Sequence, residues 1–76
     1  MTEVEWLDIF GDNLKSMLEH ANMTQMELAE YSGLSKAAIS RYINKERIPS
    51  LRAIINISYA LECDVGELID FNEPIY

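Results

Sequence analysis

The fold is decided by residues 24–50, which read TQMELAEYSGLSKAAISRYINKERIPS. The stretch opens with Thr24 and, three residues later, Glu27, the pair that forms a capping box at the start of a helix. Gly33 is suited to the left-handed backbone that ends a helix. Ser35 then offers a hydroxyl N-cap for the next one. We therefore expect two short helices joined by a tight turn.

The second of these helices, expected over residues 35–44, has two different faces. Consecutive residues of an α-helix are rotated by about 100°, so Ala38, Ile39, Tyr42 and Ile43 share an apolar arc. The opposite arc carries small, polar and cationic side chains and no acid: Lys36, Ala37, Ser40, Arg41 and Asn44. A tight turn that presents such a helix outward is the geometry of a helix-turn-helix, whose second helix enters the major groove of DNA.

The chemistry of this outward arc suits base edges. Lys36 and Arg41 can donate to guanine O6 and N7. Ser40 and Asn44 can hydrogen-bond to base edges or phosphates, and Ala37 can contact a thymine methyl. These residue types therefore predict direct readout of DNA sequence.

Phosphate contacts are expected on both sides of this helix. Lys45 and Arg47 follow it directly and are placed for contacts that hold register without reading sequence. The free amides at the start of the first helix, beside Thr24 and Gln25, form a second seat for a phosphate.

Helical patterns continue on both sides of the pair. The preceding segment is amphipathic, ends at Asn22, and has apolar residues at helical spacing at Phe10, Leu14, Met17, Leu18 and Ala21. A fourth helix is expected after Pro49-Ser50, with its core positions at Leu51, Ile54, Ile55, Ser58 and Leu61. Asp64 and Glu67 match a further capping box, which predicts a short fifth helix through Ile69. Residues 71–76 form a tail.

These patterns predict an all-α fold, a compact five-helix bundle that forms a single domain over residues 1–76. The helix-turn-helix motif occupies residues 24–44. Trp6, Leu7 and Ile9 exceed what a minimal bundle needs, and they either complete the core or form a dimer patch.

Composition excludes several classes of protein. The chain has 76 residues, of which 49% are hydrophobic and 25% charged, as in a globular domain. One cysteine and one histidine, Cys63 and His20, leave no disulfide framework and no metal site. The chain shows no nucleophile–base pair and no phosphate loop, so we expect no enzyme activity and no cofactor. An acidic N-terminus and the lack of a long apolar run predict a cytoplasmic protein without a membrane partner.

The charge is distributed unevenly along the chain. The formal net charge is −7, yet five of the six basic residues lie between Lys36 and Arg52. Local field at a contact surface, rather than the chain total, determines whether a polyanion binds there. The total predicts weak nonspecific attraction to DNA.

Four segments resemble a known family: residues 24–29 (TQMELA), 33–35 (GLS), 39–43 (ISRYI) and 47–50 (RIPS). They are similar to the phage lambda repressor/Cro family of helix-turn-helix proteins, and the resemblance extends over roughly residues 13–69. It implies a bundle of about five helices. It also implies that Gln25 clamps a phosphate and braces the recognition helix. Relatives often have Asn-Gly-Lys-Arg where this chain has residues 44–47, Asn-Lys-Glu-Arg.

The resemblance further implies base-facing positions at Lys36, Ala37, Ser40 and Arg41 and a backbone-contacting loop at Asn44, Lys45 and Arg47. The complete expected DNA-binding set is Gln25, Ser35, Lys36, Ala37, Ser40, Arg41, Asn44, Lys45 and Arg47.

The expected function is sequence-specific binding of a double-stranded DNA operator by a small transcriptional regulator, a repressor, that acts as a homodimer. The dimer surface is expected on the fifth helix and tail, at Leu68, Ile69, Phe71, Ile75 and Tyr76, with Trp6 as an alternative. Two other functions stay open. One is an antitoxin that binds DNA and grips a toxin with its tail. The other is a protein-interaction module that uses the acidic surface and does not bind DNA.

Overall fold

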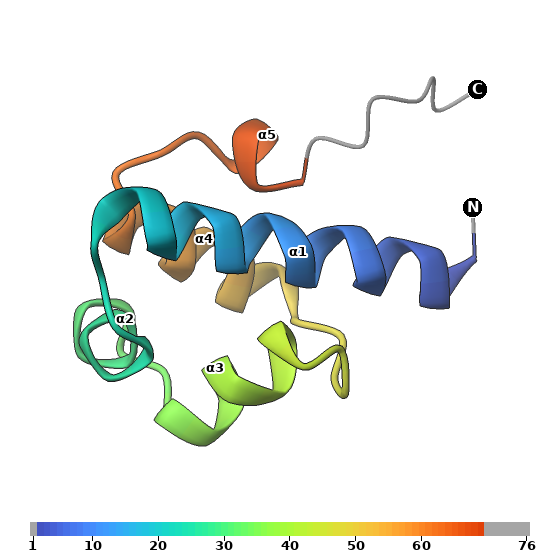
Figure 1. Cartoon of the computed structure of the whole chain (residues 1–76), viewed down its shortest axis with the longest axis horizontal. Coiled ribbons are helices and arrows are strands. Elements are labelled where there is room, and N and C mark those ends of the chain that lie inside the picture. The colour runs from blue at the N-terminus through green and yellow to red at the C-terminus, as the bar shows by residue number, and fades with distance from the viewer. Residues whose placement is uncertain (1, 70–76) are drawn as a thin grey trace.

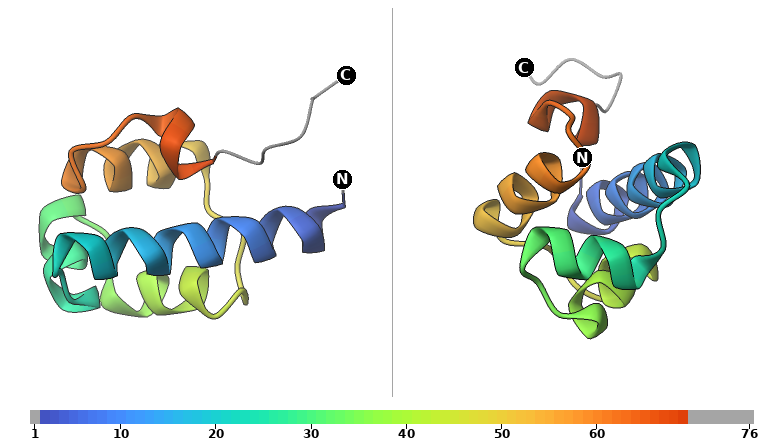
Figure 2. Two further views of the ribbon diagram at one scale, coloured as in Figure 1. Left: turned by 45° about the horizontal axis from the view of Figure 1, so that its top comes forward. Right: turned by 90° about the vertical axis from the view of Figure 1, so that its left-hand side faces the viewer.

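The computed structural model describes residues 2–69, and within them it contains five helices and no strand (Figure 1). The helices are α1 (Glu3–Ala21), α2 (Gln25–Ser32), α3 (Lys36–Ile43), α4 (Leu51–Ala60) and α5 (Val65–Leu68). The long α1 runs through the domain, with α3 on one side of it and α5 on the other (Figures 1 and 2). The predicted five-helix bundle is confirmed.

Side-chain caps set where most of the helices begin. Thr24 and Glu27 form the reciprocal capping box of α2, with both hydrogen bonds at 3.0 Å. The hydroxyl of Ser35 accepts from the amide of Ala38 at 3.0 Å, and that of Ser50 begins α4 in the same way. These caps, which act over three residues, confirm the predicted starts of α2, α3 and α4.

The capping box predicted at Asp64 and Glu67 is wrong. The side chain of Asp64 makes no capping hydrogen bond to α5. The amide of Glu67 donates instead to the backbone carbonyl of Asp64, at 3.0 Å. Because α5 is a single turn of four residues, this tight backbone bond takes the donor that a capping carboxylate would use.

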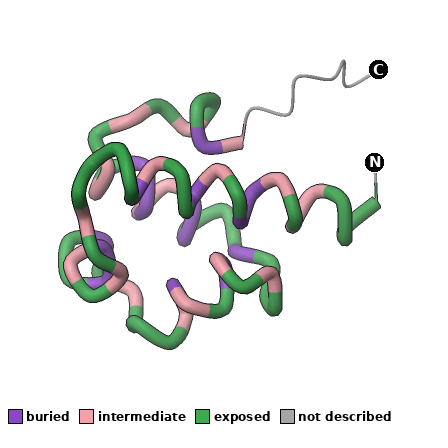
Figure 3. Tube along the Cα trace, in the orientation of Figure 1, coloured by how far each residue is buried: buried purple, intermediate pink, exposed green. Residues whose placement is uncertain are grey.

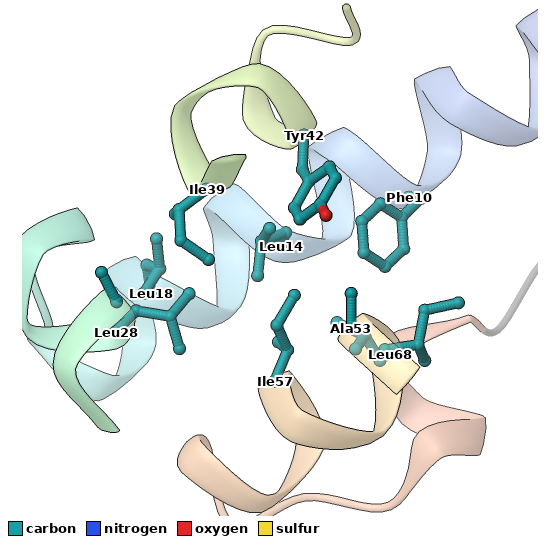
Figure 4. Packing of buried hydrophobic residues seen from close by; sticks show 11 residues of the cluster. Phe10, Leu14, Leu18, Leu28, Ile39, Tyr42, Ala53, Ile57 and Leu68 are labelled. Atoms are coloured by element: carbon teal, nitrogen blue, oxygen red, sulfur yellow. The ribbon is translucent and has the colours of Figure 1, made fainter. Parts of the chain in front are cut away.

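The core lies where all five helices meet (Figure 4). Buried residues recur on α1 about once per turn (Figure 3). The largest side chains with no more than 2% exposure are Phe10, Leu14, Leu28, Ile39, Ile57 and Leu68. Every helix therefore contributes at least one fully buried side chain.

The buried face of α4 matches the prediction at Ile54 and Ser58 but not at Leu51. Leu51, predicted to be in the core, is 69% exposed, whereas Ile57 is fully buried. The inward face passes through Ala53, Ile54, Ile57 and Ser58. Because apolar residues lie on more than one side of this helix, two rotations about its axis could each bury an apolar face. Packing against α2 and α5 selects one of these rotations.

The helix α1 begins earlier than its apolar repeat suggested, at Glu3, where the hydroxyl of Thr2 accepts from the amide of Glu5 at 3.2 Å. Trp6 stacks on Phe10 with ring centroids 5.2 Å apart. Phe10 in turn meets the ring of Tyr42 edge to face at 6.3 Å. Trp6 therefore extends an aromatic row that joins α1 to α3.

Two glycines carry geometric demands. Gly33 ends α2 with a positive φ of 75°, so the predicted left-handed turn is confirmed. Gly11 is buried where α1 crosses the end of α3, and a Cβ there would lie 3.0 Å from the carbonyl oxygen of Tyr42. The close approach of Gly11 to the end of α3 was not predicted, because residues 11 and 42 are far apart in the chain.

Alanine at Gly33 is expected to destabilise the fold. The left-handed conformation costs an L-residue about 1–2 kcal/mol, and no atom lies within 4 Å of the added Cβ, so backbone strain is the whole effect. Gly66→Ala is the matched control, because its Cβ also meets open space and its φ is not positive. Urea unfolding should show a lower midpoint for Gly33→Ala alone. Equal midpoints for both variants would contradict the left-handed turn.

Candidate nucleic-acid interface

The turn between α2 and α3 is fixed by local hydrogen bonds. The amide of Gly33 donates to the carbonyl oxygen of Ala29 at 3.0 Å. The buried hydroxyl of Ser32 accepts from the amide of Leu34 at 3.2 Å and donates to the same carbonyl at 3.4 Å. The part that Ser32 takes in the turn was not recognised from the sequence. These bonds hold the two helices at a fixed angle.

Two side chains orient α3 on the domain. Ile39 is fully buried and Tyr42 is 5% exposed, and both point from α3 into the core (Figure 4). The opposite arc consequently faces away from the core. On it, Lys36, Ala37, Arg41 and Asn44 are exposed and Ser40 is half-buried. The predicted division of this helix into an inner and an outer face is confirmed.

The cationic side chains of this outer arc form no ion pairs with other residues in the part of the chain that the structure describes. Over residues 2–69, the ion pairs of the structure all involve Lys45. Lys36, Arg41 and Arg47 are exposed and make no ion pair within that part of the chain. Three cationic side chains at or near α3 can therefore meet an anionic ligand.

The two polar residues on the outer arc, Ser40 and Asn44, are hydrogen-bonded to each other. The amide nitrogen of Asn44 donates to the hydroxyl of Ser40 at 3.3 Å. The amide oxygen of Asn44 and the hydroxyl proton of Ser40 stay available to an external partner. One turn of α3 can thus both accept and donate a hydrogen bond in a fixed geometry.

Lys45, expected to contact phosphate, lies against α1 instead of extending into solvent. Its Nζ is 2.9 Å from an Asp12 carboxylate oxygen and 3.8 Å from one of Asp8. The hydrogen bond that the ammonium donates to Asp12, with added attraction from both carboxylates, raises the pKa of Lys45 above its ordinary value. Its φ is +63°, at the position where the resembled family often has glycine. The loop after α3 is therefore tied to α1.

The start of α2 is where a second phosphate contact was expected. The capping box uses the amides of Thr24 and Glu27, which leaves those of Gln25 and Met26 at the positive end of the helix dipole. A hollow of about 520 Å³ lies beside them, and its lining includes Lys15 and Gln25 together with the acidic Glu19. Lys15 was not recognised from the sequence, because the packing of α1 against α3 brings it here.

A family model described as a Cro/C1-type HTH DNA-binding domain matches residues 13–74. The chain belongs to this family. The match contains the whole helix-turn-helix and all residues of the expected DNA-binding set, so the predicted family of DNA-binding transcriptional regulators is confirmed.

Relatives of this Cro/C1-type domain include regulators of several kinds. The chain is 29% identical to the HTH-type transcriptional regulator YqaE of Bacillus subtilis over 90% of its length, and 37% identical to the HTH-type transcriptional repressor RghR of the same organism over 74%. It is 34% identical over 82% to the control protein C.SmaI of Serratia marcescens. The chain spans 60% of YqaE, 42% of RghR and 74% of C.SmaI.

Solved structures share the fold. The restriction-modification controller protein C.AhdI of Aeromonas hydrophila superimposes with a TM-score of 0.80 at 29% identity, covering 82% of this chain and 94% of C.AhdI. An HTH_3 family transcriptional regulator from Vibrio cholerae has a TM-score of 0.87 at 20% identity, covering 91% of this chain and 39% of that one.

Within residues 2–69, no helix has the length and apolar character to cross a membrane.

The capping box at the start of α2 offers a local test. Thr24→Ala should lower the free energy of unfolding by about 1 kcal/mol, because it removes the acceptor of the Glu27 amide. Thr24→Ser is the matched control, since it keeps the hydroxyl. Thermal unfolding followed by circular dichroism would compare the two. Equal melting temperatures for Thr24→Ala and the wild type would show that the box does not hold this helix.

Proposed function

We propose that the protein binds a specific double-stranded DNA operator by inserting α3 into the major groove, and that it represses transcription by occupying that site. The observation that carries this proposal is the outer arc of α3, which is acid-free, exposed and held outward by Ile39 and Tyr42. RghR is a transcriptional repressor by name, and C.SmaI and C.AhdI are control proteins by name, which supports a regulatory role. The mechanism is binding alone, without catalysis or a cofactor.

Each side of the interface has a distinct task. Base edges are read by the arc of α3, with Arg41 and Lys36 as donors to guanine and Ala37 small enough to allow close approach to the groove floor. Phosphates are held by Gln25 and Lys15 at the start of α2, by Ser35 at the start of α3, and by Asn44 and Arg47 after it. These phosphate contacts fix the register in which the base contacts are made.

The charge of the rest of the domain favours specificity over general affinity. The net charge is −7, so sequence-independent attraction to DNA, which depends on neutralised phosphates, is weak. Binding then depends on the few cations near α3 and on correct base contacts. Selection of bound duplexes from random DNA, followed by mobility shift at two salt concentrations, tests this function. Failure to select any sequence would contradict it.

Arg41 and Arg47 are expected to contribute in different ways. Arg41→Ala should cost about 1–3 kcal/mol on the selected site and relax the preference at one base position. Arg47→Ala should weaken all sequences about equally and reduce the salt slope by about one. Arg41→Lys is the control, because it keeps the charge without the bidentate guanidinium. Binding titrations on the selected site and on single-base variants measure these effects. Identical behaviour of the two alanine variants would contradict the assignment.

The alternative functions make different predictions. A protein-interaction module that keeps this fold would show no salt-dependent DNA binding. An antitoxin would bind DNA and would also grip a toxin with residues 71–76, which lie outside the described residues. The cationic arc of α3 favours the DNA-binding proposal over the first alternative.

The proposed operator complex contains a homodimer. A single recognition helix reads too few base pairs to identify a site within a genome. Two protomers related by a twofold axis would read half-sites about 34 Å apart.

The dimer surface predicted from sequence needs correction. Leu68 is fully buried in the domain's own core, and Ile69 is half-buried. Phe71, Ile75 and Tyr76 lie outside the described residues. Leu68 was expected to bury its apolar side chain against a second copy, whereas the packing of α5 against α1 and α4 buries it within the domain.

The alternative dimer surface, near Trp6, is better supported, because exposed apolar residues lie there. Ile48 and Leu51 are 46% and 69% exposed. With Trp6, Pro49, Ile54 and Glu3 they line a hollow of about 240 Å³. A twofold axis here would bring the segments that follow both α3 helices together.

A charge placed on this surface should separate the protomers. Leu51→Glu should reduce the stoichiometry on an inverted repeat from two protomers toward one. Tyr59→Glu is the matched control, because Tyr59 lies on the same helix with 78% exposure and does not line the hollow. Sedimentation and stoichiometric titration would measure this. Full-affinity binding of one wild-type protomer to a single half-site would contradict the dimer.

A further inference from the structure

We propose that Asp8 and Asp12 of α1 set the strength of DNA binding by holding Lys45 as their own counter-ion, which withdraws it from the DNA backbone. This inference rests on the proposed function. It assigns a role in DNA binding to two acids on a helix that lies outside the helix-turn-helix.

The position of Lys45 is well defined. The residue lies two positions after the end of α3, and its backbone is fixed by hydrogen bonds from its own amide to Tyr42 at 3.2 Å and from the Glu46 amide to Arg41 at 2.8 Å. Its side chain passes over Gly11, since a Cβ at that glycine would lie 2.9 Å from Lys45 Cγ. The lysine stem is therefore laid along α1, and α1 and α3 lie side by side (Figure 2).

The ammonium group ends between two carboxylates. Asp12 is 2.9 Å and Asp8 3.8 Å from Nζ, and the lysine side chain is only 34% exposed. The two acids lie one helical turn apart on α1, so both face the same point. Their side chains are 71% and 55% exposed, which places the carboxylates on the surface beside the loop.

The net charge of Lys45, Asp8 and Asp12 explains why they weaken DNA binding. Two carboxylates and one ammonium sum to one negative charge, so the loop does not present the single positive charge that Lys45 alone would give. A phosphate that approaches Lys45 must displace Asp12 and stay close to both carboxylates, which repel it. A lysine already paired with protein carboxylates also adds little to the release of counter-ions from DNA.

The test is a salt titration of DNA binding by the full chain. Asp8→Asn with Asp12→Asn should tighten binding to the selected operator and steepen the log–log salt slope by about 0.9, the contribution of one further phosphate contact. Lys45→Gln should change the slope little in the wild type. In the double-asparagine background, Lys45→Gln should remove the gain, because the freed lysine is the cause of it.

The matched control is Glu62→Gln with Glu67→Gln. This variant removes the same two charges from the α4–α5 end of the domain, whereas the loop after α3 lies on the other side of α1 (Figure 1). It should raise affinity without the change in slope that depends on Lys45. Circular dichroism melts confirm that each variant is folded at the temperature of the titration.

Each outcome decides the proposal. Equal slopes for the double-asparagine variant and the control would overturn it, and so would weaker binding of the double-asparagine variant. A full one-unit loss of slope on Lys45→Gln in the wild type would also overturn it, because Lys45 would then already contact phosphate. An absence of DNA binding by every variant, including the wild type, would instead contradict the proposed function itself and this inference with it.

Discussion

The structure depends on the contact between α1 and the inner face of α3. Ile39 and Tyr42 are buried against the core residues of α1, and the absence of a side chain at Gly11 allows the two helices to approach this closely. The contact fixes the rotation of α3 about its own axis. Because the rotation is fixed, the outward direction of Lys36 and Arg41 follows from the burial of their neighbours.

This same contact couples α1 to DNA binding. The aromatic row of Trp6, Phe10 and Tyr42 ties the first half of α1 to the recognition helix. On the adjacent surface, Asp8 and Asp12 meet Lys45. In the proposed complex, one helix therefore positions α3 through its buried side and lowers the positive charge of the neighbouring loop through its exposed side. The acidic character of the chain has a local effect at this point, in addition to its general one.

Much of the fold could be predicted from the sequence because it rests on interactions between close neighbours in the chain. The capping box of Thr24 and Glu27, the left-handed Gly33 and the two faces of α3 all act within four residues, so residue types and spacing were enough. Most of the features that escaped prediction are tertiary, whereas the failed cap at Asp64 and the hydroxyl bonds of Ser32 are local. The burial of Ile57 in place of Leu51 depends on how α4 packs, and the burial of Leu68 depends on how α5 packs. The expected DNA-binding residues gather around α3, but the pairing of Lys45 with Asp12 joins two segments that lie far apart in the chain and share no pattern along it.

The most direct test of the account is a nuclear magnetic resonance titration of the isotope-labelled protein with its selected duplex. If α3 lies in the major groove, the amide signals that shift will belong to the start of α2, to the outer arc of α3 and to the loop that follows it. Signals from the α4–α5 turn, on the other side of α1, should stay in place. Shifts centred on that acidic turn, with the signals of Lys36, Ser40 and Arg41 unchanged, would contradict the claim that α3 reads the DNA.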